Sequence, residues 1–293
     1  MDIIEIFCKI DDFCNEFLPK LEKTLLSNIS TKKHRKSSLS TSEVMTILVM
    51  FHISNYRNFK YYYLNIILGN SKSLFPKAVS YNRFIELIPS TLIPMIAFMQ
   101  NNCYGECSGI SFIDSTTLKV CHNKRIYSNK VFKSIAERGK SSTGWFYGFK
   151  LHLVINEKGE ILSSLLTPGN VDDRNESVIS SLTKNLFGKL IGDRGYLSEK
   201  IFNMLFEKGI QLITKIRKNM KNKLMPLEDK LLLRKRAIIE SVNDQLKNIS
   251  QIEHSRHRSV GNFIANVLSG IIAYSFREKK PSIFSNESGI ICC

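Results

Sequence analysis

Long hydrophobic runs are missing from this sequence of 293 residues. The longest nearly apolar stretch, residues 263–276, is shorter than the roughly 20 residues that a helix needs to cross a bilayer. The opening residues MDIIEIF carry Asp2 and Glu5, whereas a secretion signal begins with positive charge. We therefore expect no membrane span, no secretion signal and a cytoplasmic location.

A disulfide framework is also missing. The seven cysteines are odd in number and have no regular spacing, which indicates reduced thiols. One group of residues has the types that bind zinc: Cys103, Cys107, Cys121 and His122. The spacing of the first two is poor for zinc, and no second cysteine pair follows. Ordinary thiols are therefore the preferred interpretation.

Acidic residues are scarce. The chain has 26 of them against 42 lysines and arginines, which gives a formal net charge of +16. A protein this basic normally has an acidic partner, with nucleic acid the first candidate and an anionic membrane surface the second. The positive charge is interleaved with aromatic residues, as in YRNFKYYY and GWFYGFK, which favours nucleic acid.

The first 105 residues have the apolar spacing of helices. Ser40 and Glu43 form a capping-box pair that predicts the start of one of them. We predict an all-α N-terminal domain over residues 1–105, which either binds DNA or serves as a helical dimerisation cap. Its candidate phosphate contacts are Arg57, Lys60 and Arg83.

From about Ser108 the pattern changes to strands. Residues 108–114 predict a strand that ends on Asp114, and residues 116–121 predict its antiparallel return. Later strands alternate with helices, so we predict an α/β fold with a mixed sheet and flanking helices over residues 106–280. The ribonuclease-H-like fold has this order. Residues 281–293 are expected to form a flexible tail.

Residues 227–248 predict a single helix with two distinct faces. Arg236, Glu240, Asn243 and Lys247 fall within an arc of about 40°, and the apolar residues gather on a separate face. A solvated helix scatters its charges as ion pairs one turn apart, whereas this helix aligns one carboxylate between two cations and an amide.

Two aspartates provide the matching carboxylates. Asp114 and Asp193 each end a predicted strand, and the carboxyl ends of neighbouring parallel strands meet at one edge of a sheet. Two carboxylates so close repel each other unless a cation lies between them. With Glu240, they form a set of oxygen ligands suited to two Mg²⁺ or Mn²⁺ ions. The alternative is that each aspartate caps a turn.

These motifs resemble a known family. FIDST around Asp114, IGDRGY around Asp193 and the spacing Arg236-x3-Glu240-x6-Lys247 are similar to the DDE transposases of bacterial insertion sequences. GWFYGFKLHLVIN and TPGNVDDR resemble the IS982 branch of that superfamily. One position departs from the family signature, because Leu233 stands where the family has tyrosine.

The resemblance implies a ribonuclease-H-like enzyme in which Asp114, Asp193 and Glu240 are catalytic and hold two Mg²⁺ or Mn²⁺ ions. It implies terminal inverted repeats and target DNA as partners, and a homodimer in the synaptic complex. The reaction would be DNA strand cleavage followed by strand transfer. The rival interpretations are a ribonuclease-H-like nuclease without strand transfer, and a catalytically inactive DNA-binding copy.

Several further residues are candidates for DNA contact. Arg194 either binds the attacked phosphate or forms a surface ion pair, and His152 either faces DNA or is buried. Trp145 either stacks on a base or packs in the core, and residues 125–142 form either an arm that DNA orders or a solvated loop. The other candidates are Arg236, Lys247, Lys150, His254, Arg256, His257 and Arg258.

Overall fold

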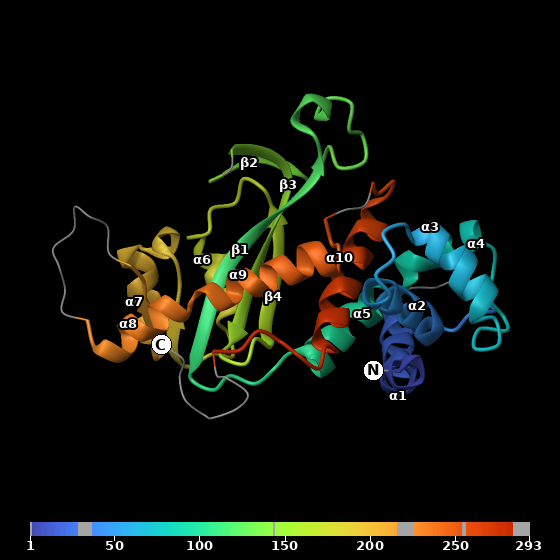
Figure 1. The fold of residues 1–293 in the computed structure, drawn as a ribbon, viewed down its shortest axis with the longest axis horizontal. Helices are drawn as coiled ribbons and strands as arrows, with labels where there is room; N and C mark the ends of the chain where they lie inside the picture. Colours follow the sequence, from blue (N-terminus) through green and yellow to red (C-terminus); the bar gives the residue numbers. More distant parts are fainter. Residues whose placement is uncertain (1, 29–36, 143, 216–224, 254–255, 284–293) are drawn as a thin grey trace. The chain divides into compact units, whose positions relative to one another are not determined.

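The computed structural model describes residues 2–28, 37–142, 144–215, 225–253 and 256–283 (Figure 1). The chain divides into two compact units. The first comprises Met1–Cys103 and Leu246–Glu278, and the second comprises Tyr104–Gln245 and Lys279–Cys293. The predicted division placed all of residues 106–280 in one domain, whereas the structure groups residues 246–278 with the N-terminal helices. His254, a predicted DNA contact, lies outside the described residues.

The first unit is helical in its described residues. Its α-helices are α1 (Ile3–Asn28), α2 (Thr41–Ile53), α3 (Phe59–Tyr62), α4 (Tyr81–Leu87), α5 (Leu92–Phe98) and α10 (Val260–Ser275). Short 3₁₀ or π segments extend them: η1 (Tyr63–Asn70), η2 (Ile88–Thr91) and η3 (Met99–Cys103). The predicted capping box at α2 is confirmed, because Ser40 and Glu43 exchange hydrogen bonds between side chain and backbone N–H.

One helical stretch of this unit differs from the expectation about membrane spans. Tyr81–Cys103, which joins α4, η2, α5 and η3, is long and apolar enough to cross a membrane by length and composition. Core helices of soluble proteins pass the same test, and Phe84, Met95 and Phe98 are buried in the unit's core. The stretch is therefore weak support for a membrane span.

The second unit contains a six-stranded mixed sheet. Its strands are β1 (Ile110–Cys121), β2 (Glu137–Ser141), β3 (Gly144–Asn156), β4 (Ile161–Pro168), β5 (Gly188–Ile191) and β6 (Ile210–Ile213). The order is β2-β3-β1-β5-β6, with β4 also paired to β3. The pairs among β1 to β4 are antiparallel, whereas β5 lies parallel to both β1 and β6.

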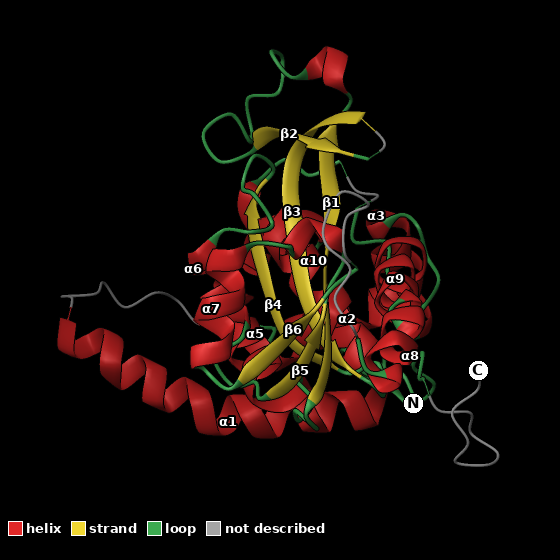
Figure 2. Cartoon of the chain, turned by 90° about the vertical axis from the view of Figure 1, so that its left-hand side faces the viewer, coloured by secondary structure: helices red, strands yellow, loops and turns green. Residues whose placement is uncertain are grey.

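Helices cover both faces of this sheet (Figure 2). On one face, α6 (Glu176–Leu182) and α7 (Glu199–Glu207) close a core that includes Ile113 of β1. On the other face, α9 (Ala237–Asp244) packs against β1 and buries Ile239 and Val242. Successive side chains of a strand point to opposite faces, so Asp114, the neighbour of Ile113, faces α9.

The predicted turn after Asp114 is wrong. β1 runs without interruption through Asp114 because β3 pairs with it along its length, with Asp114 opposite Leu153 and Thr116 opposite Leu151. The residues that were read as two short strands are therefore one strand of 12 residues. Asp114 lies in the middle of this strand and not at its end.

The predicted helix over residues 227–248 is interrupted. It consists of α8 (Leu227–Lys235), a turn at Arg236, α9, and the π segment η6 (Gln245–Ile249). Arg236 keeps right-handed helical backbone angles, φ −54° and ψ −24°, and neither proline nor glycine stands at the interruption. Lys247 lies within the π segment and belongs to the first unit.

The start of the predicted flexible tail is ordered. Ile283 is buried, and its backbone N–H donates to the carbonyl of Glu157 at 3.1 Å. Residues 284–293, the rest of that predicted tail, lie outside the described residues.

Candidate active site

Strand register brings Asp114 and Asp193 to adjacent positions. β5 pairs with β1 in parallel, and the last pair of the ladder joins Phe112 to Ile191. Two residues beyond that pair on each chain segment stand Asp114 and Asp193. Neighbouring strands lie about 4.8 Å apart, so the two aspartates follow the same end of the parallel ladder side by side. This register agrees with the predicted approach of the two aspartates, which stays a prediction, and only Asp193 stands after the end of its strand.

Helix α9 brings the third carboxylate toward the same place. Asn243 of α9 donates from Nδ2 to Oδ2 of Asp114 at 3.0 Å, which fixes the helix against β1. Glu240 stands one turn earlier, where the i, i+3 spacing puts it on the same side of the helix as Asn243. Arg236, one further turn back, forms an ion pair with Glu240. The helix break thus leaves Arg236, Glu240 and Asn243 aligned.

The electrostatics of Asp114 reflect this gathering of acids. Burial raises the pKa of Asp114 to about 6, the charge of Arg236 lowers it, and the charges of Asp193 and Glu240 raise it further. Each of these groups acts on the same carboxyl. Burial is the main cause of the raised pKa, and the charges of Arg236, Asp193 and Glu240 all act on this carboxyl, so the four side chains form one electrostatic group.

Each of the three carboxylates already has a donor from the protein. Asn243 donates to Asp114, Arg236 donates to Glu240, and Asp193 caps the 3₁₀ turn η5 (Arg194–Tyr196) by accepting from the N–H of Gly195 at 2.7 Å. Among the described residues, no group of three or more His, Cys, Asp or Glu side chains is close enough to hold a metal ion. In this conformation the turn-capping alternative describes Asp193, and the three acids are neighbours without a ligating geometry.

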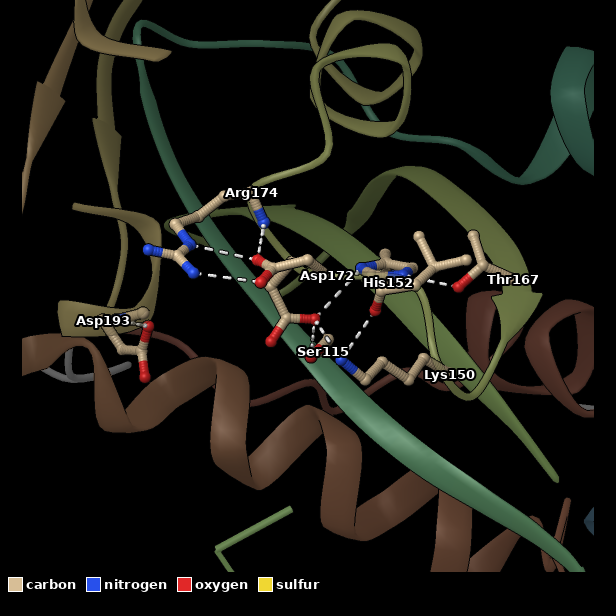
Figure 3. A network of polar contacts seen from close by, with 10 residues as sticks. Ser115, Lys150, His152, Thr167, Asp172, Arg174 and Asp193 are labelled. Atoms are coloured by element: carbon tan, nitrogen blue, oxygen red, sulfur yellow. Dashed lines mark hydrogen bonds and ion pairs between the residues drawn. The ribbon is translucent and has the colours of Figure 1, made fainter. Parts of the chain in front are cut away.

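A polar network includes Ser115, Lys150, His152 and Thr167 (Figure 3). Because Ser115 is the neighbour of Asp114 on β1, the network lies on the opposite face of that strand. Oδ1 of Asp173 accepts from Ser115 at 2.9 Å and from the ammonium of Lys150 at 3.1 Å. Nε2 of His152 lies 2.9 Å from Oγ1 of Thr167. The network connects the loop after β4 to β1 and β3. Its residue on β1, Ser115, is the sequence neighbour of Asp114.

This network changes the interpretation of two predicted DNA contacts. The His152 side chain is fully buried and burial lowers its pKa to about 4, so the buried alternative holds and the predicted DNA contact is wrong for it. The Lys150 ammonium is bonded to the carbonyl of Val171 and to Asp173, so the protein already satisfies it. The helix that follows this loop, α6, begins at the N-cap Asn175.

Three polar residues of the site region were not predicted from the sequence: Ser115, Asp173 and Tyr196. Ser115 and Asp173 lie far apart in the sequence and meet only because β4 returns beside β3. The Tyr196 side chain is buried, burial raises the pKa of its hydroxyl, and this hydroxyl interacts with Ser115. Successive residues of a strand alternate between its two faces, so Ser115 could have been predicted to share the face of Ile113, which is covered by α6 and α7.

The remaining basic candidates fall into two groups. Arg194 is exposed beside Asp193, in the same unit as the three carboxylates. Lys247, Arg256 and Arg258 belong to the first unit. Lys247 is paired with Glu253 at 3.2 Å, whereas Arg256 and Arg258 are exposed.

Comparison with known proteins identifies the second unit. A family model described as "Transposase DDE domain" matches residues 104–260. Comparison with curated protein sequences gives no match. Among solved structures, the chain is similar to a piggyBac transposase synaptic complex with hairpin DNA, with 9% sequence identity and a TM-score of 0.47. The alignment covers 92% of this chain and 72% of the piggyBac chain. The chain is also similar to the Mos1 strand transfer complex, with 10% identity and a TM-score of 0.26 over 90% of this chain and 84% of that one.

Neither structural likeness is close enough to assign a fold or a function. The family match covers more than half of the chain and includes all three carboxylates, Asp114, Asp193 and Glu240. On that match, the chain belongs to the family of transposases with a DDE domain.

Proposed function

We propose that this protein is an active DDE transposase. It binds the terminal inverted repeats of its element, cleaves DNA by hydrolysis, and joins the freed 3′-hydroxyl to target DNA at the same site. Asp114, Asp193 and Glu240 are the catalytic residues in this proposal. The observation that carries it is the register of β1 and β5, which puts Asp114 and Asp193 side by side under the helix that bears Glu240.

The finer family assignments belong to the same proposal. A sheet with four strands in antiparallel pairs and two following parallel strands, covered by helices on both faces, supports a ribonuclease-H-like fold. The stretches GWFYGFKLHLVIN and TPGNVDDR support the IS982 branch. We further propose a cytoplasmic protein that works as a homodimer in the synaptic complex.

The donor set fits a pair of divalent cations. Three carboxylates supply hard oxygen ligands, which Mg²⁺ and Mn²⁺ prefer, and the charges of Asp193 and Glu240 both act on the buried carboxyl of Asp114. Asp114, Asp193 and Glu240 would hold the ions. When bound, such ions activate the attacking hydroxyl and stabilise the leaving oxygen in phosphodiester chemistry.

The chain's own residues have distinct tasks around that site. Asn243 orients Asp114 through the 3.0 Å hydrogen bond. Arg236 orients Glu240 through an ion pair to Oε1, and opening this pair would give a metal ion access to both carboxylate oxygens. Arg194, exposed beside Asp193, is suited to bind a phosphate of the strand being cut. Ser115 and Asp173 brace β1 from the opposite face.

Strand transfer separates a transposase from a plain nuclease. A duplex from the DNA that borders the coding sequence, pre-cut to expose its 3′-hydroxyl, is incubated with the protein, Mg²⁺ and a supercoiled plasmid. We expect joined products in which the labelled end is covalently attached to the plasmid. Nicked plasmid without joined label would indicate the nuclease alternative, and no Mg²⁺-dependent product of either kind would indicate an inactive DNA-binding copy.

A further inference from the structure

Trp145 stands at the start of β3 and is 52% exposed, so it does not pack in the core. It is the only tryptophan of the chain. Two cations lie over its ring: the guanidinium of Arg138 is 4.8 Å from the ring centroid and the ammonium of Lys140 is 5.8 Å from it. Both distances are within the range of cation–π attraction.

Strand pairing builds this cluster of Arg138, Lys140 and Trp145. In the antiparallel ladder of β2 and β3, Lys140 lies opposite Trp145 and Arg138 lies opposite Tyr147. Residues opposite each other share a face, and so do alternate residues of one strand, so the two cations and the ring are on one face. The cluster is therefore set by the sheet and not by a chance meeting of surface side chains.

The segment that leads into β2 is anchored as well. Phe132 is buried against Phe149, and its carbonyl accepts from the hydroxyl of Tyr147 at 3.2 Å. The side chain of Asn123 donates to the carbonyl of Trp145 at 2.7 Å. The residues predicted as an arm that DNA orders are thus folded against β3 without DNA, and they present a fixed surface.

The charge of this surface is one-sided. Residues 122–145 contain six lysines and arginines and a single acid, Glu137. Neither Arg138 nor Lys140 has an ion pair with an acidic side chain among the described residues. Stacking on an indole fixes the plane of a guanidinium and leaves its N–H edge free for an anion. Phosphate is the anion that such a fork recognises best.

The cluster lies on the sheet face that carries Asp114. Asp114 is opposite Leu153, and Trp145 is eight residues from Leu153 along β3, an even number that keeps it on the same face. At about 3.3 Å per residue the separation along the strand is roughly 26 Å. A DNA duplex rises about 3.4 Å per base pair, so this separation corresponds to about eight base pairs.

We propose that Arg138, Lys140 and Trp145 form a second DNA contact site that binds the phosphate backbone about eight base pairs from the phosphate being cut. This inference rests on the proposed function, because it takes the carboxylate site as the point of cleavage. Arg138 and Lys140 bind phosphates, and Trp145 holds the guanidinium in position while the duplex covers its exposed ring.

The experiment uses the full-length protein and a mixed-sequence DNA duplex of about 40 base pairs, because phosphate contacts do not depend on sequence. Affinity is measured by the anisotropy of labelled DNA over a range of salt concentrations. The Arg138→Ala/Lys140→Ala variant should lower the slope of log K against log salt by about 1.8, since each lost phosphate contact contributes about 0.9. In the unmodified protein, acrylamide quenching of the single tryptophan should fall when DNA binds.

The matched control is Lys158→Ala/Lys184→Ala, which removes two exposed lysines elsewhere in the same unit. A double variant of Arg138 and Lys140 that binds like this control, or a Trp145 that is quenched equally with and without bound DNA, would overturn the site. Either result leaves the proposed function standing if the protein still nicks DNA. An unmodified protein that does not bind the duplex would overturn both.

Discussion

Changing Asp114 or Asp193 to asparagine, or Glu240 to glutamine, is expected to abolish Mg²⁺-dependent nicking of DNA. Each change keeps the shape of the side chain and removes the negative charge that a divalent ion needs. A metal contributes several kcal/mol to the stabilisation of charge in such reactions, so we expect losses of at least ~10³-fold in rate, or about 4 kcal/mol in the barrier. The measurement is single-turnover nicking of a labelled duplex.

DNA binding provides the control for these three variants. Because the phosphate contacts come from lysines and arginines, each variant should bind a duplex as tightly as the unmodified protein, or more tightly, since one negative charge is lost. Asp244→Asn is a matched variant, because it changes an exposed carboxylate of the same helix that the proposal does not use. Retained nicking in any of the three would remove that residue from the proposed catalytic set.

Acid is expected to destabilise the helical unit through two histidines, the buried His52 and the half-buried His257. His52 is fully buried, with Nδ1 against the carbonyl of Ser250 and Nε2 2.9 Å from Oγ of Ser269. Burial lowers the pKa of His52 from 6.5 to about 4, and burial and the charge of His52 lower the pKa of His257 to about 4. Between these values the unfolded chain binds protons that the folded unit does not. The stabilisation is therefore complete above pH 6.5 and is lost as the pH falls toward 4.

The expected loss of stability follows from the difference between the pKa of each histidine in the unfolded chain, 6.5, and in the folded unit, about 4. Between about pH 7 and pH 5 the free energy of unfolding should fall by about 2 kcal/mol for each histidine, since one pKa unit corresponds to about 1.4 kcal/mol. In the other unit burial also lowers the pKa of His152 to about 4, so this histidine loses stability in the same window, whereas Asp114 acts in the opposite direction because its pKa is raised to about 6 and its protonation favours the folded state. The larger loss should therefore appear in the unfolding transition of the first unit, which carries two histidines with lowered pKa values.

Urea unfolding followed by circular dichroism at the two pH values measures this effect. His52→Gln keeps an amide that can bond Ser250 and Ser269, and it should reduce the loss by about half. His122→Gln replaces an exposed histidine and should leave the loss unchanged. An equal free energy of unfolding of the first unit at both pH values would show that folding does not lower the pKa of His52 and His257.

The sequence carried the strongest local signals of this structure. The capping box of Ser40 and Glu43 is a short-range pattern, and it is present in the structure as predicted. The polar face of Arg236, Glu240 and Asn243 depends only on helical spacing, and it persists across the break at Arg236 because that residue keeps helical backbone angles. The strand-end motif at Asp193 is equally local.

Features set by long-range pairing were not predictable in the same way. β1 continues through Asp114 because β3 supplies a partner at each position, and a single sequence does not reveal that partner. His152 is buried because Thr167 of β4 lies beside it, and Trp145 is exposed because β2 ends next to it. The assignment of residues 246–278 to the helical unit depends on the packing of α10 against α2 and α5.

Anomalous scattering from crystals grown with Mn²⁺ tests the central claim most directly. The account predicts one or two anomalous peaks among the carboxylate oxygens of Asp114, Asp193 and Glu240, with the Arg236–Glu240 ion pair opened and no peak in the Asp114→Asn variant. Density that leaves Glu240 paired with Arg236, and no manganese at Asp114 or Asp193 at saturating Mn²⁺, would contradict it.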